Sequence, residues 1–121
     1  MSQREHDRRI DYIEFTVSDV AAAKRFYGTV FGWTFTDYGA DYASFEDGRL
    51  TGGFRGGGSA KPGGPLVVIY AADLETVLGA VKAAGGRVIR PTYDFPGGRR
   101  FHFQDPAGCE LAVWSDPVSP G

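Results

Sequence analysis

The stretch SDVAAAKRFYGTVFGW, residues 18–33, decides the fold. Its first two residues, serine and aspartate, offer a side-chain cap for a helix N-terminus. Residues 20–31 then place apolar side chains at helical spacing. Gly32 is suited to end the helix, because glycine adopts the left-handed conformation of a C-cap easily. Upstream, residues 10–17 alternate and are rich in β-branched and aromatic residues, so the segment predicts a strand that leads into a capped helix.

Three further strands are predicted in the first half of the chain. They are rich in β-branched and aromatic residues and are separated by glycine-containing turns, and they lie at residues 33–38, 42–46 and 50–55. The first half is therefore expected to form a βαβββ unit.

The second half repeats this order. A strand at 66–71 is followed by Asp73 as an N-cap and by a helix at 74–84. Strands are then predicted at 87–90, 99–104 and 109–114. Displacing one half by 54 residues superposes Asp19 on Asp73 and Gly32 on Gly86 without a gap. The agreement of element order with cap positions indicates an internal duplication.

Later positions correspond once small insertions in the turns are allowed. Phe45 is then expected opposite Phe103, and Phe54 opposite Trp114. The predicted fold class is α+β, with two tandem βαβββ modules. The predicted divisions are a flexible N-terminal tail at 1–9, module one at 10–55, a connector at 56–64, module two at 65–115 within a single domain 10–115, and a C-terminal tail at 116–121.

Composition limits the classes of function. The chain has 121 residues, 42% of them hydrophobic, so it suits one globular domain with a real core. A net charge of -2 offers no broad basic field, so neither nucleic acid nor an anionic membrane is an expected partner. The single cysteine, Cys109, closes no disulfide within the chain, and no apolar leader or membrane-length run is present. A cytoplasmic location is expected.

Two motifs resemble those of a known family. RFYGTVFGW at residues 25–33 resembles the opening of proteins of the vicinal-oxygen-chelate superfamily, which includes glyoxalases, bleomycin resistance proteins and extradiol dioxygenases. FQDPAGCELAVW at 103–114 is similar to the family's D-P-x-G-N ending, with Cys109 in place of the usual asparagine. The resemblance implies an open eight-stranded bowl with helices outside and a small ligand inside. It also implies a homodimer, with each bowl built within one chain or across two.

The resemblance also identifies four positions that hold metal ligands in many members of the family. In this chain the expected positions hold Tyr12, Gly52, Leu66 and Ala112. Three of these residues have no side-chain donor, so no metal and no other cofactor is expected. Side chains two apart on a strand share a face, however, so Glu14 and Glu110 with His102 leave a displaced divalent-metal site open as an alternative.

Strand alternation predicts which side chains line the bowl. Ile13, Phe15 and Val17 are expected under the helices. The residues expected to contact a ligand alternate with such core positions and are Tyr12, Glu14, Tyr42, Arg100, His102, Glu110 and Trp114. Glu14, His102 and Glu110 are the candidate acid–base residues, because a carboxylate beside an imidazole can move a proton. An ion pair of Glu110 with Arg99 or Arg100 is the structural alternative.

Three functions remain open from the sequence. The leading one is a protein that binds a small organic molecule in a bowl without metal, with catalysis unproven. The second is a metal-dependent lyase or dioxygenase of the lactoylglutathione-lyase type, and the third is a non-enzymatic interaction or regulatory module. The glycine-rich run at 56–64 lacks the ending of a phosphate-binding loop and is expected to be a connector.

Overall fold

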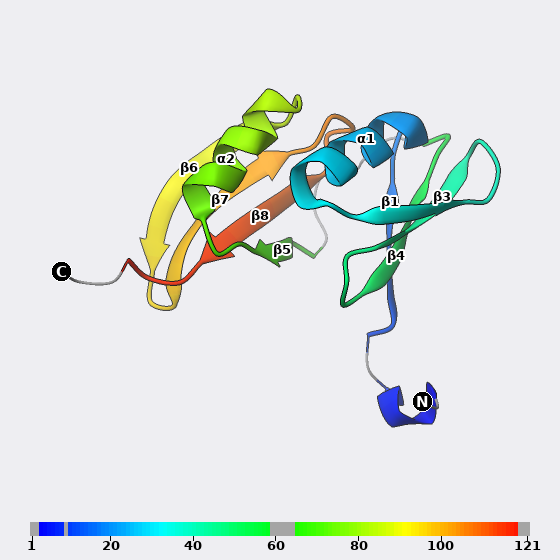
Figure 1. The fold of residues 1–121 in the computed structure, drawn as a ribbon, viewed down its shortest axis with the longest axis horizontal. Coiled ribbons are helices and arrows are strands. Elements are labelled where there is room, and N and C mark those ends of the chain that lie inside the picture. Colours follow the sequence, from blue (N-terminus) through cyan, green and yellow to red (C-terminus); the bar gives the residue numbers. More distant parts are fainter. Residues whose placement is uncertain (1–2, 9, 59–64, 119–121) are drawn as a thin grey trace.

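The computed structural model describes residues 3–8, 10–58 and 65–118, and shows two modules with the same order of elements (Figure 1). A short 3-10 helix at Gln3–His6 precedes them. Module one contains β1 (Tyr12–Thr16), α1 (Val20–Phe31), β2 (Thr34–Asp37), β3 (Tyr42–Glu46) and β4 (Thr51–Arg55). Module two contains β5 (Val67–Tyr70), α2 (Leu74–Ala83), β6 (Arg87–Phe95), β7 (Gly98–Gln104) and β8 (Glu110–Ser115). The predicted fold class, two tandem βαβββ modules, is confirmed.

Each module forms its own four-stranded mixed sheet. The strand orders are β1-β4-β3-β2 and β5-β8-β7-β6, so the first strand of each module pairs in parallel with the last and forms one edge. Both helices lie on the same side of the sheets (Figure 1). The opposite side of each sheet is called the open face below.

The helices begin where the cap residues predict. Asp19 accepts a hydrogen bond from the Ala22 amide at 3.1 Å, and Asp73 accepts one from the Thr76 amide at the same distance. Gly32 ends α1 in the left-handed conformation, with φ of 73°. The equivalent N-caps of the two helices support the duplication.

One hydrophobic core is shared by the two modules. Phe26 on α1 packs against Phe103 on β7, with ring centroids 5.9 Å apart. Tyr27, also on α1, donates a buried hydrogen bond to Asp105 in the turn before β8, at 2.8 Å. Asp105 is 5% exposed and also accepts bonds from the Ala107 and Cys109 amides. The first helix therefore packs against both modules.

On the strands that surround the core, side chains predicted to point toward the helices do so. Val17, Phe54, Phe101 and Phe103 are fully buried and belong to the core under the helices. Phe15 packs against the same core. The open face therefore carries the alternate residues on these strands, as expected from the pleat.

Three details of the sequence prediction are wrong. β6 extends to Phe95 rather than stopping at residue 90, and two register irregularities carry it past Pro91. α2 ends at Ala83, with Ala84 as its C-cap. Phe54 is buried in the core, whereas Trp114 is only partly buried and lies on the other face, so Phe54 does not correspond to Trp114.

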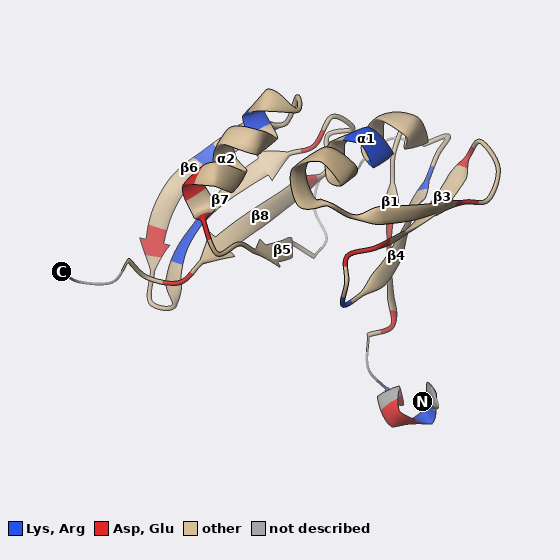
Figure 2. Cartoon of the chain, viewed as in Figure 1, with Lys and Arg blue, Asp and Glu red and all other residues tan. Residues whose placement is uncertain are grey.

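Charged residues of both signs are mixed over the two modules (Figure 2). No helix within residues 3–8, 10–58 and 65–118 combines the length and apolar character needed to cross a membrane.

Candidate functional site

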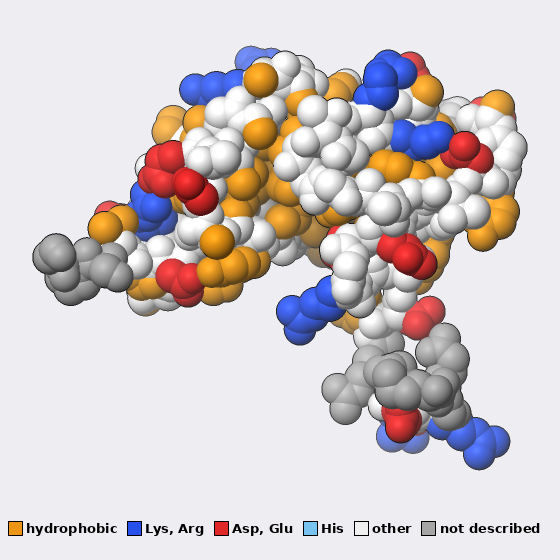
Figure 3. Space-filling view, in the orientation of Figure 1, with side chains coloured by type: hydrophobic (Ala, Val, Ile, Leu, Met, Phe, Trp, Pro, Cys, Tyr) orange, Lys and Arg blue, Asp and Glu red, His pale blue; other side chains and the backbone are white. Residues whose placement is uncertain are grey.

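A cavity of about 660 Å³ lies between the two modules, beneath the C-terminal end of α1. Its walls come from both sheets and are mainly apolar and aromatic. The lining residues are Ile13, Phe15, Phe31, Trp33, Phe45, Asp47, Arg49, Leu50, Val67, Val68, Ile69, Tyr70 and Trp114. Hydrophobic side chains also gather at the junction of the modules on the molecular surface (Figure 3). The cavity fits a small molecule that is largely apolar.

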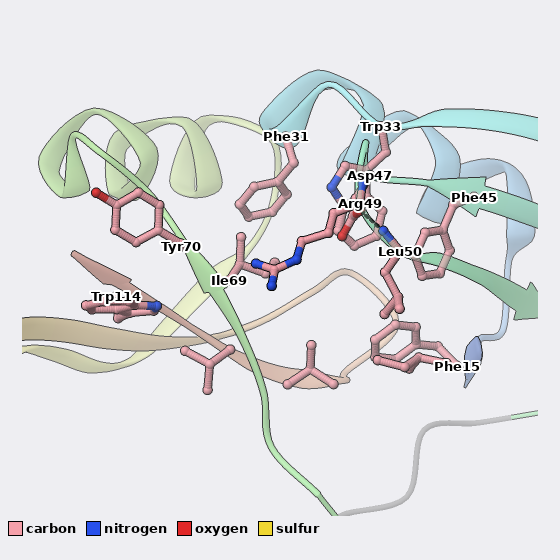
Figure 4. A pocket seen from close by; sticks show the side chains of 13 residues that line it. Phe15, Phe31, Trp33, Phe45, Asp47, Arg49, Leu50, Ile69, Tyr70 and Trp114 are labelled. Carbon is pink, nitrogen blue, oxygen red and sulfur yellow. Dashed lines mark hydrogen bonds between the residues drawn. The ribbon is translucent and has the colours of Figure 1, made fainter. Parts of the chain in front are cut away.

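Arg49 is exposed and places a positive charge at the edge of this apolar space. Figure 4 shows its side chain extending from the β3–β4 turn toward Ile69, below Phe31 in this view. Asp47 holds the turn by accepting the Arg49 amide at 2.8 Å. The Asp47 carboxylate is therefore engaged with the backbone, and the guanidinium of Arg49 is available to an acidic or strongly polar oxygen of a ligand.

The predicted residues of module one form a cluster on its open face. The hydroxyls of Tyr12 and Tyr42 are hydrogen-bonded to each other, and Tyr42 donates to Glu14 at 2.9 Å. Lost hydration and these hydrogen bonds raise the pKa of Tyr42 above its usual value. Gly53 lies beneath them, and a Cβ there would overlap both hydroxyls. Glycine thus makes room for the two tyrosines to meet.

A second cluster centres on His102, on the open face of module two. His102 is 6% exposed. Its Nδ1 lies 2.9 Å from Oε2 of Glu110, and its Nε2 lies 2.9 Å from the hydroxyl of Tyr93. Both ring nitrogens are therefore occupied by protein partners, one a carboxylate and the other a phenol.

Two arginines flank the phenol of Tyr93. Nε of Arg100 donates a hydrogen bond to the Tyr93 oxygen, and the guanidinium carbon of Arg90 lies 3.8 Å from the centroid of the Tyr93 ring. A guanidinium over an aromatic face is attracted by the electron-rich ring. The cluster therefore combines a phenol, an imidazole and a carboxylate with two cations.

Trp114 connects the cavity with this second cluster. It lines the cavity and is the strand neighbour of Arg100 in the β7–β8 pairing. Phe95 lies near both residues, with its ring centroid 6.4 Å from that of Trp114 and 5.5 Å from the guanidinium carbon of Arg100. Trp114 is therefore the residue through which the cavity borders the polar cluster of module two, whose own members do not line the cavity.

The structure gathers the predicted site residues into these two clusters. Tyr12, Glu14 and Tyr42 meet in module one, whereas Arg100, His102 and Glu110 meet in module two. Trp114 is the one predicted ligand-binding residue that lines the cavity. Sequence reasoning missed Arg49, Arg90 and Tyr93. In the sequence Tyr93 lies between Arg90 and the pair Arg99–Arg100, and this aromatic residue among arginines was the available signal. It was missed because that part of β6 was not predicted as a strand.

The ion pair of Glu110 with Arg99 or Arg100, considered from the sequence, does not form. Arg99 reaches the other side of the sheet and pairs with Glu75 of α2, with N–O distances of 2.5 and 3.3 Å. This pair lowers the pKa of Glu75 and raises that of Arg99. Arg100 donates a hydrogen bond to Tyr93, and the Glu110 carboxylate bonds to His102 instead of to an arginine.

One of the four positions compared with metal-ligand positions also needs correction. A Cβ at Gly52 would overlap the Phe45 ring and the Ile13 carbonyl, so Gly52 faces the core. Its neighbour Gly53 faces the open side and is the structural counterpart of Ala112. With Gly53 in place of Gly52, the four compared positions hold Tyr12, Gly53, Leu66 and Ala112.

The displaced donors do not converge within the chain. Glu14 bonds to Tyr42 in module one, and His102 bonds to Glu110 in module two. Within residues 3–8, 10–58 and 65–118, no three His, Cys, Asp or Glu side chains lie close enough together to hold a metal ion.

Cys109 packs against the core and is half-buried. Its thiol donates to the Thr16 carbonyl at 3.6 Å. Burial, followed by the charge of Asp105, raises the pKa of the Cys109 thiol to about 12. A thiol with a raised pKa is a poor nucleophile, so Cys109 suits a structural role.

The profile of the Glyoxalase/Bleomycin resistance protein/Dioxygenase superfamily matches residues 9–113 of the chain. The chain belongs to this superfamily. The glyoxalase-superfamily resemblance seen in the two sequence motifs is therefore confirmed over nearly the whole chain.

Similar proteins agree with this assignment. The anthracycline biosynthesis protein DnrV of Streptomyces peucetius is 37% identical over 85% of the chain, and the match spans 45% of DnrV. The chain thus covers less than half the length of this relative. Among solved structures, a glyoxalase-related enzyme from Fulvimarina pelagi has a TM-score of 0.78 at 21% identity, covering 93% of this chain and 91% of that one.

A further solved structure shares the same fold. The fosfomycin resistance protein FosX from Listeria monocytogenes, as an E126Q mutant with Mn(II) and a dihydroxypropylphosphonic acid, has a TM-score of 0.79 at 14% identity, with 92% of each chain covered. At this identity the likeness concerns the fold alone.

Proposed function

We propose that the chain binds a small, planar organic molecule in the cavity between its modules, and that it does so without a metal ion. The observation that carries the proposal is the aromatic lining of that cavity. Phe31, Trp33 and Phe45 come from module one, and Tyr70 and Trp114 come from module two. Flat rings gain most from such walls, because aromatic surfaces stack and bury large apolar areas.

The donor chemistry supports the metal-free form. The side chains at the four corrected positions are a phenol, an aliphatic chain, a methyl group and a hydrogen atom, at Tyr12, Leu66, Ala112 and Gly53. A divalent cation needs several fixed carboxylate, imidazole or thiolate donors. Polar groups of the ligand are therefore bound by protein side chains, first of all by Arg49 at the cavity.

The charge of Arg49 narrows the class of ligand. A guanidinium among aromatic walls favours a ligand that carries an acidic oxygen on a flat ring system. DnrV is named for anthracycline biosynthesis, and anthracyclines contain fused planar rings with phenolic oxygens. A polycyclic aromatic acid is therefore the class of ligand that we propose for this chain.

Tryptophan fluorescence offers a direct test, because both tryptophans of the chain line the cavity. We expect anthraquinone-2-sulfonate to quench the emission of Trp33 and Trp114 saturably, with one site per chain. Arg49→Ala should weaken binding about tenfold, the equivalent of one charge-assisted contact. Arg25→Ala, on the exposed side of α1, is the matched control and should bind as wild type does.

Two results would contradict the proposal. Absence of saturable quenching by the anthraquinone and by related polycyclic acids would exclude ligand binding in the cavity and favour an interaction module. Stoichiometric nickel, zinc, manganese or iron in protein purified without chelator would exclude the metal-free form and favour a metal-dependent lyase or dioxygenase.

A further inference from the structure

We infer that Tyr93, His102 and Glu110 form a proton-transfer array, which accepts a proton from an acidic hydroxyl or an enolisable C–H group of the bound molecule. This inference rests on the proposed ligand-binding function and adds a chemical role to the open face beside the cavity. Tyr93 is the residue that meets the ligand, His102 receives the proton, and Glu110 positions His102.

The hydrogen bonds of the array have a single consistent direction. An ionised carboxylate only accepts hydrogen bonds, so the bond between His102 and Glu110 places the imidazole proton on Nδ1. A neutral imidazole carries one proton, so Nε2 is then an acceptor. The Tyr93 hydroxyl, 2.9 Å from Nε2, therefore donates to it. The phenol proton already points to its acceptor.

The Tyr93 oxygen keeps one free position for a ligand. It donates to His102 and accepts from Nε of Arg100. A phenol oxygen has two acceptor lone pairs, so one remains. Arg100 at the oxygen and Arg90 over the ring, at 3.8 Å from its centroid, favour negative charge here and on a ligand oxygen nearby.

The imidazole is the buried centre of the array. His102 is 6% exposed, whereas Tyr93 on one side of it is partly exposed and the Glu110 side chain on the other is 48% exposed. A ligand on the open face therefore reaches the phenol before the imidazole. At Nε2 the proton route runs through Tyr93, because the other ring nitrogen is bonded to Glu110.

The proton-transfer step balances without a further reactant. The ligand's acidic hydrogen passes to the Tyr93 oxygen as the phenol proton passes to Nε2 of His102. The products are the ligand anion, a neutral Tyr93 and an imidazolium. Glu110 stabilises the imidazolium, and Arg90 and Arg100 stabilise the ligand anion. Returning the proton to another atom of the ligand would complete an isomerisation.

The first test needs no ligand. Long-range proton–nitrogen NMR of the histidine ring should show the Nδ1–H form of His102, with Nε2 unprotonated. His102→Gln identifies the signal, since His6 is the only other histidine. Glu110→Gln should shift the ring toward a mixture of tautomers. An Nε2–H form in the wild-type protein would overturn the inference, because Tyr93 would then be the acceptor.

The second test uses p-nitrophenol, an acidic phenol whose anion absorbs visible light. At a pH at which the free compound is mostly protonated, adding wild-type protein should produce the absorption of bound p-nitrophenolate. Tyr93→Phe keeps the ring under Arg90 and should reduce this signal at least about tenfold, the loss expected for a hydrogen bond to a charged group. Tyr38→Phe, at an exposed tyrosine of module one, is the matched control.

The outcomes separate the array from ligand binding itself. Anthraquinone quenching without any bound p-nitrophenolate would overturn the array and leave the proposed function standing. An equal p-nitrophenolate signal in wild type and Tyr93→Phe would also overturn it. Loss of the signal in Tyr93→Phe, with quenching and thermal stability unchanged, supports the array even if His102→Gln does not fold.

Discussion

Asp105→Ala is expected to lower the free energy of unfolding by about 4 kcal/mol. The carboxylate accepts hydrogen bonds from the Tyr27 hydroxyl at 2.8 Å and from the Ala107 and Cys109 amides at 2.9 Å each. Alanine would leave the buried Tyr27 hydroxyl and two partly buried amides without this acceptor, and an unpaired buried group costs about 1–3 kcal/mol. Chemical denaturation, followed by circular dichroism, measures the change.

Asp105→Asn is the matched control, because its amide oxygen can still accept from the two backbone amides. It should retain most of the stability lost in Asp105→Ala. A stability of Asp105→Ala within about 1 kcal/mol of wild type would contradict the importance of this buried network.

A comparison of wild type with Asp105→Asn should also reveal a dependence of stability on pH. Burial, partly offset by the hydrogen bonds from Cys109 and Tyr27, raises the pKa of Asp105 above its ordinary value. The folded protein therefore keeps this proton to a higher pH than the unfolded chain does. As pH rises between these two pKa values, wild type should lose stability relative to Asp105→Asn. A flat or rising difference across that interval would contradict the shift.

Gly52→Ala is expected to destabilise the protein by about 3 kcal/mol or more. A Cβ at this position would overlap the Phe45 ring and the carbonyl oxygen of Ile13, the β1 residue that pairs with Gly52. The side chain of Phe45 is confined within the core, and the carbonyl belongs to the backbone of β1. Relief therefore requires β1 to move away from β4. Thermal and denaturant unfolding measure this loss.

Gly79→Ala provides a contrasting control. Gly79 lies in α2 and is exposed, and a Cβ added there would meet no atom within 4 Å outside its own helix backbone and chain neighbours. Alanine there should stabilise the protein by about 0.5–1 kcal/mol through its higher helix propensity. Equal stability of the two alanine variants would contradict the prediction that the close approach of β1 to β4 leaves no room for a Cβ at Gly52.

Local signals in the sequence were sufficient to predict much of the fold. The bounds of α1 are those predicted, because Asp19 and Gly32 determine its ends through their own backbone and side-chain chemistry. The repeat of Asp19 at Asp73 then located α2. Burial under the helices followed from simple alternation on short regular strands such as β7.

Alternation fails where a strand is irregular, and this hid part of the site. Arg90 and Tyr93 are three residues apart, so a regular strand would place them on opposite faces. The register shift between them instead sets Arg90 opposite His102 and Tyr93 opposite Arg100, so both reach the open face. The sequence alone does not show how far such a bulge shifts a strand.

Long-range contacts were also beyond the sequence prediction. The reach of Arg49 into the cavity depends on how module one sits against β5 of module two. No spacing within either half encodes that placement. The metal-ligand position was assigned to Gly52 rather than Gly53 for a related reason, since the two glycines differ only in the face they occupy.

The hydrogen bond between Tyr27 and Asp105 joins a helix of one repeat to a turn of the other. Duplicated halves would be able to melt separately if each had its own interior, but here α1 shares its core with β7. Both repeats should consequently open together in native-state hydrogen exchange. Cooperativity of this kind would couple the two walls of the cavity, because neither half would unfold while the other stays folded.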